Sequence, residues 1–238
     1  IKLSLQSILN QDFPDNQYEI LIIDGESDDR TIDVARQVIE EYRTSHETCP
    51  KVQYLQNERR ILAAGWNLGI RHSKGEYVFR IDAHSKIPSD YIRKCVNTIT
   101  NHEAVCVGGK IESNSLLEKN DIITKVLSSP FGVGNSSFRV SDTEGYADTA
   151  VYGLYKKQIF DEVGYFDESL VRNQDIELHA RIRNSGGKFY FNPEIKSVYY
   201  TRNTVKKMLK QAFQNGEWNP IVSKKTKGTL SLRHMIPF

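Results

Sequence analysis

Short apolar runs alternate with amphipathic helical segments along the first half of the chain. The run EILIID is apolar almost throughout and ends in an acid, which is typical of a buried strand in a parallel sheet. Apolar residues at helical spacing follow it from Ile32 to Tyr42. The alternation predicts an α/β fold with a central, mostly parallel sheet flanked by helices. Strands are expected at residues 19–24, 52–57, 76–82 and 104–109, and the helices between them at about 32–42, 63–73 and 88–100.

The second half is less regular, but its pattern still predicts discrete elements. A polar, glycine-bearing stretch at residues 128–145 is long for a connection and is typical of a lid or binding segment. A helix is predicted to end at a C-cap, Gly186, and the last helix to begin at Asn203 or Thr204. Further strands are expected at residues 148–155, 188–194 and 195–200.

Composition is that of an ordinary globular protein, with 39% hydrophobic and 26% charged residues. No apolar run approaches the roughly 20 residues that span a bilayer, and nothing resembles a signal peptide. Three cysteines without metal-ligand spacing predict reduced, mostly buried thiols in a cytosolic protein. Charge is uneven, because residues 202–238 carry eight Lys or Arg and one Glu, or +7, whereas the total is only +2. Residues 1–201 are therefore acidic.

Two predicted strands end in acids, at Asp24 and in the sequence Asp82-Ala83-His84. Ligands of a parallel α/β sheet bind beyond the carboxyl ends of its strands, so these acids are candidate ligand contacts. In an extended segment, residues two apart point the same way, which would let Asp82 and His84 share one Mg²⁺ or Mn²⁺ bound to a diphosphate. The alternative for both sites is an ordinary turn or helix cap.

A third carboxylate, Asp175, stands in the first turn of the helix predicted to end at Gly186. The helix dipole favours an ionised carboxylate there, and an ionised carboxylate in a cleft can act as a general base. Charge pairing at a helix start is the alternative. Glu177 is expected to pair with Arg181 one turn later, away from such a site.

Four segments of the chain occur in an order and with gaps that carry a family likeness. They are IIDGESDDRT, NERRILAAGWNLGIRHSKGEYVFRIDAHS, YGLYKKQIFDEVGYFDESLVRNQDIEL and QAFQNGEWN. The series resembles family 2 glycosyltransferases of the GT-A fold, and more closely the succinoglycan-type bacterial exopolysaccharide glycosyltransferases. The resemblance implies a metal-dependent, inverting hexosyltransferase. It would move a sugar from a nucleotide-sugar, by preference a UDP-sugar, to a glycan or lipid-linked acceptor in polysaccharide biosynthesis.

The resemblance also implies roles for particular residues. Asp24 would contact the nucleotide base, and Arg60 would lie near the uridine. Asp82 and His84 match the family motif that binds the metal ion and the diphosphate, usually D-x-D, with Mg²⁺ or Mn²⁺ as the cofactor. Asp175 matches the acid that serves as general base in inverting transfer.

The sequence departs from the family pattern at three positions. His84 replaces the second acid of D-x-D, and Gln174 replaces the acid that usually precedes the base. Glu217 stands where the Q-x-x-R-W motif of processive synthases has Arg, and a carboxylate cannot grip a diphosphate as a guanidinium does. Processive polymerisation is therefore not expected. Gln214 and Trp218 keep the rest of that motif as implied acceptor contacts, with a core aromatic as the alternative for Trp218.

The resemblance divides the chain into a GT-A catalytic domain at residues 1–201 and a basic amphipathic segment at 202–238. The nucleotide-sugar half would span roughly 1–113 and the acceptor half roughly 114–201, and the family's first strand would precede Ile1. We expect the basic segment to bind an anionic membrane surface, which would place the protein in the cytoplasm at the inner face of the plasma membrane. A solvated charged face is the alternative.

Other classes of function stay open at this point. A catalytically silent nucleotide- or sugar-binding module would keep the same fold, and Gln174, Glu217 and the missing first strand favour it. Sugar transfer or donor hydrolysis would separate that module from an enzyme. A GT-A nucleotidyltransferase would need a glycine-rich activation loop near the start, which is not visible. No nucleic-acid partner is expected, because the body is acidic and no aromatic-basic interleaving occurs.

Overall fold

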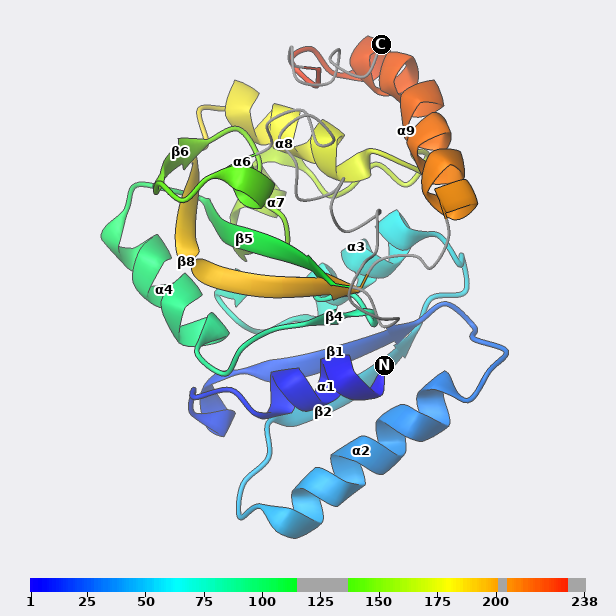
Figure 1. Ribbon diagram of the computed structural model, residues 1–238, viewed down its shortest axis with the longest axis vertical. Helices are drawn as coiled ribbons and strands as arrows, with labels where there is room; N and C mark the ends of the chain where they lie inside the picture. The colour runs from blue at the N-terminus through cyan, green and yellow to red at the C-terminus, as the bar shows by residue number, and fades with distance from the viewer. Residues whose placement is uncertain (115–136, 201–204, 231–238) are drawn as a thin grey trace.

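The computed structural model describes residues 1–114, 137–200 and 205–230 (Figure 1). Helices and strands alternate as the sequence predicts. In chain order they are α1 (Lys2–Leu9), a short 3₁₀ turn (Asp15–Gln17), β1 (Glu19–Asp24), α2 (Thr31–Ser45), β2 (Lys51–Gln56), α3 (Leu62–His72), β3 (Tyr77–Val78), β4 (Ser85–Lys86), α4 (Tyr91–Asn101), β5 (Cys106–Asn114), α6 (Ser137–Val140), β6 (Gly145–Ala147), β7 (Leu154–Lys156), α7 (Ile159–Val163), α8 (Gln174–Asn184), β8 (Phe189–Tyr200) and α9 (Val205–Lys225).

The first layer of the molecule is the parallel pair β1 and β2, packed with α1 and α2 (Figure 1). The apolar faces of these elements meet in one buried cluster, because alternate residues of β1 and helically spaced residues of α2 point the same way. Its buried members are Leu5, Leu9, Ile20, Ile22, Ala35, Val38 and Ile39. This layer places the carboxyl ends of β1 and β2 side by side, with Asp24 opposite Gln56.

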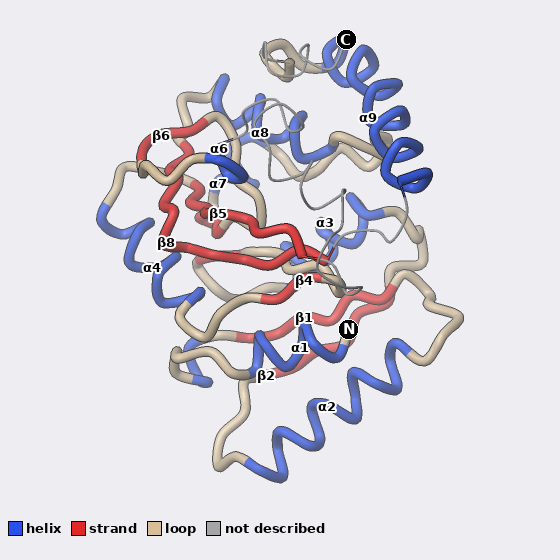
Figure 2. Tube along the Cα trace, viewed as in Figure 1, coloured by secondary structure: helices blue, strands red, loops and turns tan. Residues whose placement is uncertain are grey.

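The second sheet has the strand order β3-β7-β5-β8-β4, with β6 also paired to β8. Figure 2 shows β5 and β8 running side by side in this sheet. Only β5 and β8 are parallel in it, and the other pairings are antiparallel. The sheet is therefore mixed, where the sequence had predicted a mostly parallel one. Apolar runs indicate which residues form strands, but strand direction depends on partners far away in the chain, such as β3 and β7.

The long pair β5 and β8 forms the middle of this sheet and contains an irregularity. Its register shifts between Gly108 and Lys110. A Cβ atom at Gly109 would collide with the carbonyl oxygen of Ile195, so only glycine lets the two backbones approach this closely. Two apolar clusters pack around this pair, one with α4 and one with α7 and α8.

Most sequence-based predictions of single elements are confirmed. Helix α8 ends as expected, with Gly186 at φ +88°, and all three cysteines are free. The strand expected at 76–82 is shorter, because β3 ends at Val78. The predicted caps Asn203 and Thr204, and much of the predicted binding segment at 128–145, lie outside the described residues.

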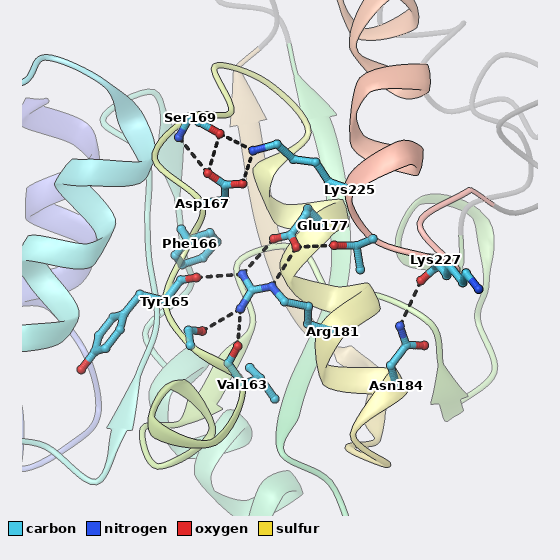
Figure 3. Close-up of polar contacts among 12 residues, drawn as sticks. Val163, Tyr165, Phe166, Asp167, Ser169, Glu177, Arg181, Asn184, Lys225 and Lys227 are labelled. Atoms are coloured by element: carbon cyan, nitrogen blue, oxygen red, sulfur yellow. Dashed lines mark hydrogen bonds and ion pairs between the residues drawn. The ribbon is translucent and has the colours of Figure 1, made fainter.

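Hydrogen bonds and ion pairs at the C-terminal end of α9 hold this helix against α8 and the segment before α8 (Figure 3). The predicted pair of Glu177 and Arg181 forms, with two guanidinium nitrogens each 2.8 Å from a carboxylate oxygen. Glu177 is only 3% exposed, and Thr226 just past α9 donates to it at 2.7 Å. Lys225 pairs with Asp167 at 2.5 Å. Within the described ranges, no helix combines the length and apolar character that crossing a membrane requires.

Candidate active site

The loops after β1 and β2 meet at one corner that holds Asp24 and Arg60. The Asp24 carboxylate accepts hydrogen bonds from the Ser27 backbone N–H at 3.1 Å and the Ser27 hydroxyl at 2.6 Å. Arg60 donates from Nε to Glu26 at 2.6 Å, and the Asp24 carbonyl accepts from the Asn57 N–H at 2.7 Å. The structure therefore brings the two predicted nucleotide contacts together, with Asp24 also closing the turn after its strand.

Asp82 and His84 lie in a turn and not in the extended segment that the sequence suggested. The Ser85 N–H donates to the Asp82 carbonyl at 3.0 Å, which closes that turn. The expectation that the two side chains share one face of a strand is thus wrong. The exposed His84 ring meets the edge of Tyr199 at 5.0 Å between centroids, whereas Asp82 is half-buried among other partners.

Arg80 and Tyr152, which the sequence analysis did not single out, are those partners. Arg80 Nε lies 3.2 Å from Asp82 Oδ1, and the Tyr152 hydroxyl donates to Asp82 Oδ2 at 3.2 Å. The Arg80 guanidinium also lies 3.6 Å from the Trp66 ring centroid. Burial raises the pKa of Tyr152, so its phenol keeps the proton that it donates. A positively charged side chain inside the strand-like run FRID could have indicated Arg80 from the sequence. No neighbouring residue in the sequence indicated Tyr152.

Asp175 is exposed in the first turn of α8, where its carboxylate accepts from the N–H of Ile176 at 2.9 Å. One turn later, His179 is buried between the Thr149 hydroxyl at 2.7 Å and the Tyr155 hydroxyl at 2.6 Å. Burial lowers the pKa of His179 to about 4, although the negative charge of Asp175 acts in the opposite direction.

Charged groups from both segments affect the pKa of His179. The positive charge of Arg80 contributes to lowering its pKa, just as Asp175 contributes to raising it. Both charges act in the same way on the buried Tyr155 phenol, whose pKa burial raises. Geometry links the same segments, because Trp66, on which the Arg80 guanidinium stacks, packs against the apolar cluster that contains Leu178 of α8.

Helix α9 contacts the segment that leads into α8. Arg172 donates to the Gln214 side-chain oxygen at 2.7 Å, and the Asn173 amide donates to the Asn215 carbonyl at 3.0 Å. Gln214, a predicted acceptor contact, is thus tied to the loop just before Asp175. Trp218 is half-buried one turn further along α9.

Backbone strain gathers around these predicted site residues. Among the described residues, four that are not glycine have positive φ: Glu26, Arg60, Tyr152 and Asn173. Each is a predicted site residue, lies two positions from one, or hydrogen-bonds to one. Left-handed backbone costs about 1–3 kcal/mol at a residue with a side chain and is concentrated at functional sites. This distribution favours the corner, the turn and the helix start as functional segments.

The Asp82 and His84 side chains fit a divalent cation by chemistry, since a carboxylate oxygen and an imidazole nitrogen both bind Mn²⁺. Within the described segments, no three His, Cys, Asp or Glu side chains cluster as a metal-binding group. Asp82 and His84 are the residues that would hold such an ion, together with oxygen atoms of a bound diphosphate or water.

The chain is similar in sequence to known glycosyltransferases. Residues 1–164 match the protein family described as glycosyl transferase family 2. A dolichyl N-acetyl-alpha-D-glucosaminyl phosphate 3-beta-D-2,3-diacetamido-2,3-dideoxy-beta-D-glucuronosyltransferase of Methanococcus voltae is 31% identical over 98% of this chain and 72% of its own length. The succinoglycan biosynthesis protein ExoA of Rhizobium meliloti (strain 1021) is 28% identical over 92% of this chain and 64% of its own length.

Solved structures share the fold at low sequence identity. The mannosyltransferase PcManGT from Pyrobaculum calidifontis, in complex with GDP-Man and Mn²⁺, aligns with a TM-score of 0.67 at 17% identity over 98% of this chain and 64% of that chain. S. aureus TarS in complex with UDP-GlcNAc aligns with a TM-score of 0.60 at 17% identity over 84% of this chain and 54% of that chain. The predicted GT-A fold is confirmed.

Proposed function

Since the chain belongs to glycosyltransferase family 2, we propose that it transfers a sugar from a nucleotide-sugar to a glycan or lipid-linked acceptor, inverting the anomeric configuration. The observation that carries the proposal is that α8, whose first turn holds Asp175, and Trp66, on which Arg80 stacks beside Asp82, pack against one apolar cluster. A general base and a diphosphate site must face one another across the reacting sugar, and this packing supports that arrangement.

The donor half of the proposed site lies at the carboxyl ends of β1 and β2 and in the turn after β3. Asp24 and Arg60 bind the nucleoside, for which UDP is the first to test. Asp82 and His84 hold Mg²⁺ or Mn²⁺ at the diphosphate. The cation, when bound, neutralises charge that develops on the leaving nucleoside diphosphate. Tyr152 keeps the Asp82 carboxylate oriented, as partners of metal ligands commonly do.

The acceptor half lies between the start of α8 and α9. Asp175 removes the proton from the acceptor hydroxyl as that oxygen attacks the anomeric carbon from the face opposite the leaving group. Gln214 and Trp218 line the acceptor side, and the contact of Gln214 with Arg172 holds α9 beside the base. The name of the Methanococcus voltae relative, which describes a glycosyl dolichyl phosphate, supports a lipid-linked saccharide as the acceptor class.

We also place the protein at the cytoplasmic face of the plasma membrane, through the outer side of α9. Exposed residues recur there every three or four positions and so occupy one face of the helix, called here the α9 strip. Its members are Lys206, Lys210, Phe213, Glu217, Ile221 and Lys224. Lysines beside exposed apolar side chains suit an anionic bilayer surface.

Calorimetric titration tests the donor site. UDP and GDP are added to the chain with and without Mn²⁺, and the tighter nucleotide is repeated on the variant Asp82→Ala. We expect metal-dependent binding that Asp82→Ala abolishes. The matched control Asp142→Ala, which removes an exposed carboxylate paired with Lys110, should leave binding unchanged. Absence of binding by the unmodified chain would contradict the proposal.

A second measurement separates an enzyme from a silent binding module. Nucleotide-sugars whose nucleotide binds are incubated with the chain and Mn²⁺, and release of the nucleoside diphosphate is followed with and without saccharide acceptors. Release that depends on Asp175 supports transfer. Binding without any release identifies the silent module.

A further inference from the structure

Asp82, the acid proposed to hold a divalent cation, already has a positive partner within the chain. Arg80 Nε lies 3.2 Å from its Oδ1 atom, and the two side chains are 34% and 25% exposed. The pair is therefore partly shielded from water but open enough for a ligand to reach it. A cation that binds Asp82 must compete with Arg80 for the same carboxylate.

The Arg80 guanidinium is held by two aromatic rings as well as by the Asp82 carboxylate. Its central carbon lies 3.6 Å from the Trp66 ring centroid and 5.9 Å from that of Tyr152. Trp66 is itself set edge-on against Phe166 at 4.5 Å. A guanidinium keeps its N–H donors in its own plane, pointing outward from the stack, so it can exchange one oxygen partner for another without leaving the ring.

The carboxylate is fixed independently of Arg80. Its second oxygen, Oδ2, accepts from the Tyr152 hydroxyl at 3.2 Å, and Tyr152 is itself held by a 2.6 Å hydrogen bond from Tyr91 to its carbonyl oxygen. The Ser85 hydroxyl also contacts the Tyr152 hydroxyl. Asp82 therefore stays in place when Arg80 changes partner.

We propose that Arg80 is a placeholder cation for Asp82 that turns to the diphosphate of the donor when the donor and its divalent ion bind. Before binding, Arg80 balances the Asp82 charge. In the complex, the Asp82 carboxylate is a ligand of the divalent ion. Arg80 donates hydrogen bonds to phosphate oxygens while it stays stacked on Trp66. Diphosphate carries several negative charges and suits a fork of N–H donors. This inference rests on the proposed donor site.

The proposal predicts opposite changes in two affinities when Arg80 loses its charge. In Arg80→Met, which keeps an apolar chain against Trp66, Mn²⁺ alone should bind about threefold more tightly, because a partly exposed competing ion pair is gone. UDP or GDP at saturating Mn²⁺ should bind about tenfold more weakly, because a charge-assisted hydrogen bond is lost. Both are measured by calorimetry on the whole chain, after circular dichroism has checked folding.

Two further variants keep the test decisive if Arg80→Met folds poorly. Arg80→Gln is neutral but polar and should give the same pair of opposite changes. Arg80→Lys keeps the charge but not the planar fork, so Mn²⁺ affinity should stay near that of the unmodified chain while nucleotide affinity falls. Arg71→Met is the matched control, because Arg71 also stacks on an aromatic ring, Tyr165 at 4.7 Å, and should change neither affinity.

The outcomes separate this inference from the proposed function. If the unmodified chain binds nucleotide with Mn²⁺ but the neutral variants weaken both ligands together, Arg80 is only a structural support and the inference is overturned. Unchanged affinities in those variants overturn it as well. In both cases the donor site stands. Failure of the unmodified chain to bind either nucleotide overturns the donor site and the inference together.

Discussion

The proposed base, Asp175, has an exposed carboxylate on a backbone that is fixed in the first turn of α8. Asp175→Asn should lower kcat by about 10²–10⁴, the usual contribution of a general base, and leave nucleotide affinity unchanged. Turnover and calorimetry on the same samples check this. Asp161→Asn, at an exposed acid in the first turn of α7, is the control and should turn over normally. Near-normal turnover in Asp175→Asn would rule out the assigned role.

His179 makes a different prediction, about stability. Burial lowers its pKa from 6.5 to about 4, so the folded protein binds this proton less readily than the unfolded chain does. The contribution of His179 to the free energy of unfolding is therefore fully present above pH 6.5. It is lost as the pH falls toward 4, and the loss is about 3 kcal/mol. Urea unfolding at pH 7 and pH 4 measures the loss.

The variant His179→Gln isolates that contribution from the carboxylates that titrate in the same window. Its unfolding free energy should fall less between pH 7 and pH 4 than that of the unmodified chain, by about 3 kcal/mol. His46→Gln, at an exposed imidazole, should behave like the unmodified chain. Equal pH dependence in both variants would contradict the assignment.

Between elements, the contact of α8 with its surroundings depends on a buried ion pair. Arg181 satisfies Glu177 and also donates to the carbonyl oxygens of Val163 and Tyr165, at 2.5 and 2.7 Å (Figure 3). It thereby ties α8 to the segment after α7. Without Arg181, the buried Glu177 carboxylate loses its positively charged partner. It keeps only the hydrogen bond that the Thr226 hydroxyl donates to it.

Arg181→Met should therefore lower the free energy of unfolding by about 3 kcal/mol, measured by urea denaturation at pH 7. Adding Glu177→Gln should recover part of the loss, since the uncompensated charge is gone. Arg93→Met is the control, because its pair with Asp12 is 48% and 41% exposed and should contribute under about 1 kcal/mol. A loss in Arg181→Met no larger than that of the control would contradict the buried-charge argument.

For the molecule as a whole, the α9 strip predicts where it resides. The chain should bind vesicles containing anionic lipid and release at high salt, because exposed charges are screened. Replacing Lys206, Lys210 and Lys224 together by Gln should weaken binding about 100-fold, from about 1 kcal/mol for each lysine. Vesicle sedimentation measures both effects.

The apolar half of the strip and a control complete that experiment. Phe213 and Ile221 are 69% and 44% exposed, and changing both to Ser should also weaken binding. Tyr146→Ser removes a 61% exposed aromatic side chain on β6, far from α9 in Figure 1, and should have no effect. Vesicle binding that does not respond to either set of α9 variants would exclude α9 as the contact.

The sequence by itself determined which segments form helices or strands and which carboxylates are candidate site residues. EILIID, the helix from Thr31 and the Glu177–Arg181 pair follow from apolar period, caps and i,i+4 spacing, which are local properties. Family motifs in register indicated Asp24, Arg60, Asp82, His84 and Asp175 as site residues. Their roles stay predictions, which the experiments above address.

Only the tertiary structure decided which residues surround those carboxylates. The mixed strand directions, the contact of Tyr152 with Asp82 and the burial of His179 between Thr149 and Tyr155 depend on contacts between segments far apart in the chain. Tyr152 reaches Asp82 across 70 positions of sequence, and no local pattern specifies such a pair. Distant pairing is fixed by the packing of whole elements, because only folding brings these side chains within hydrogen-bonding distance.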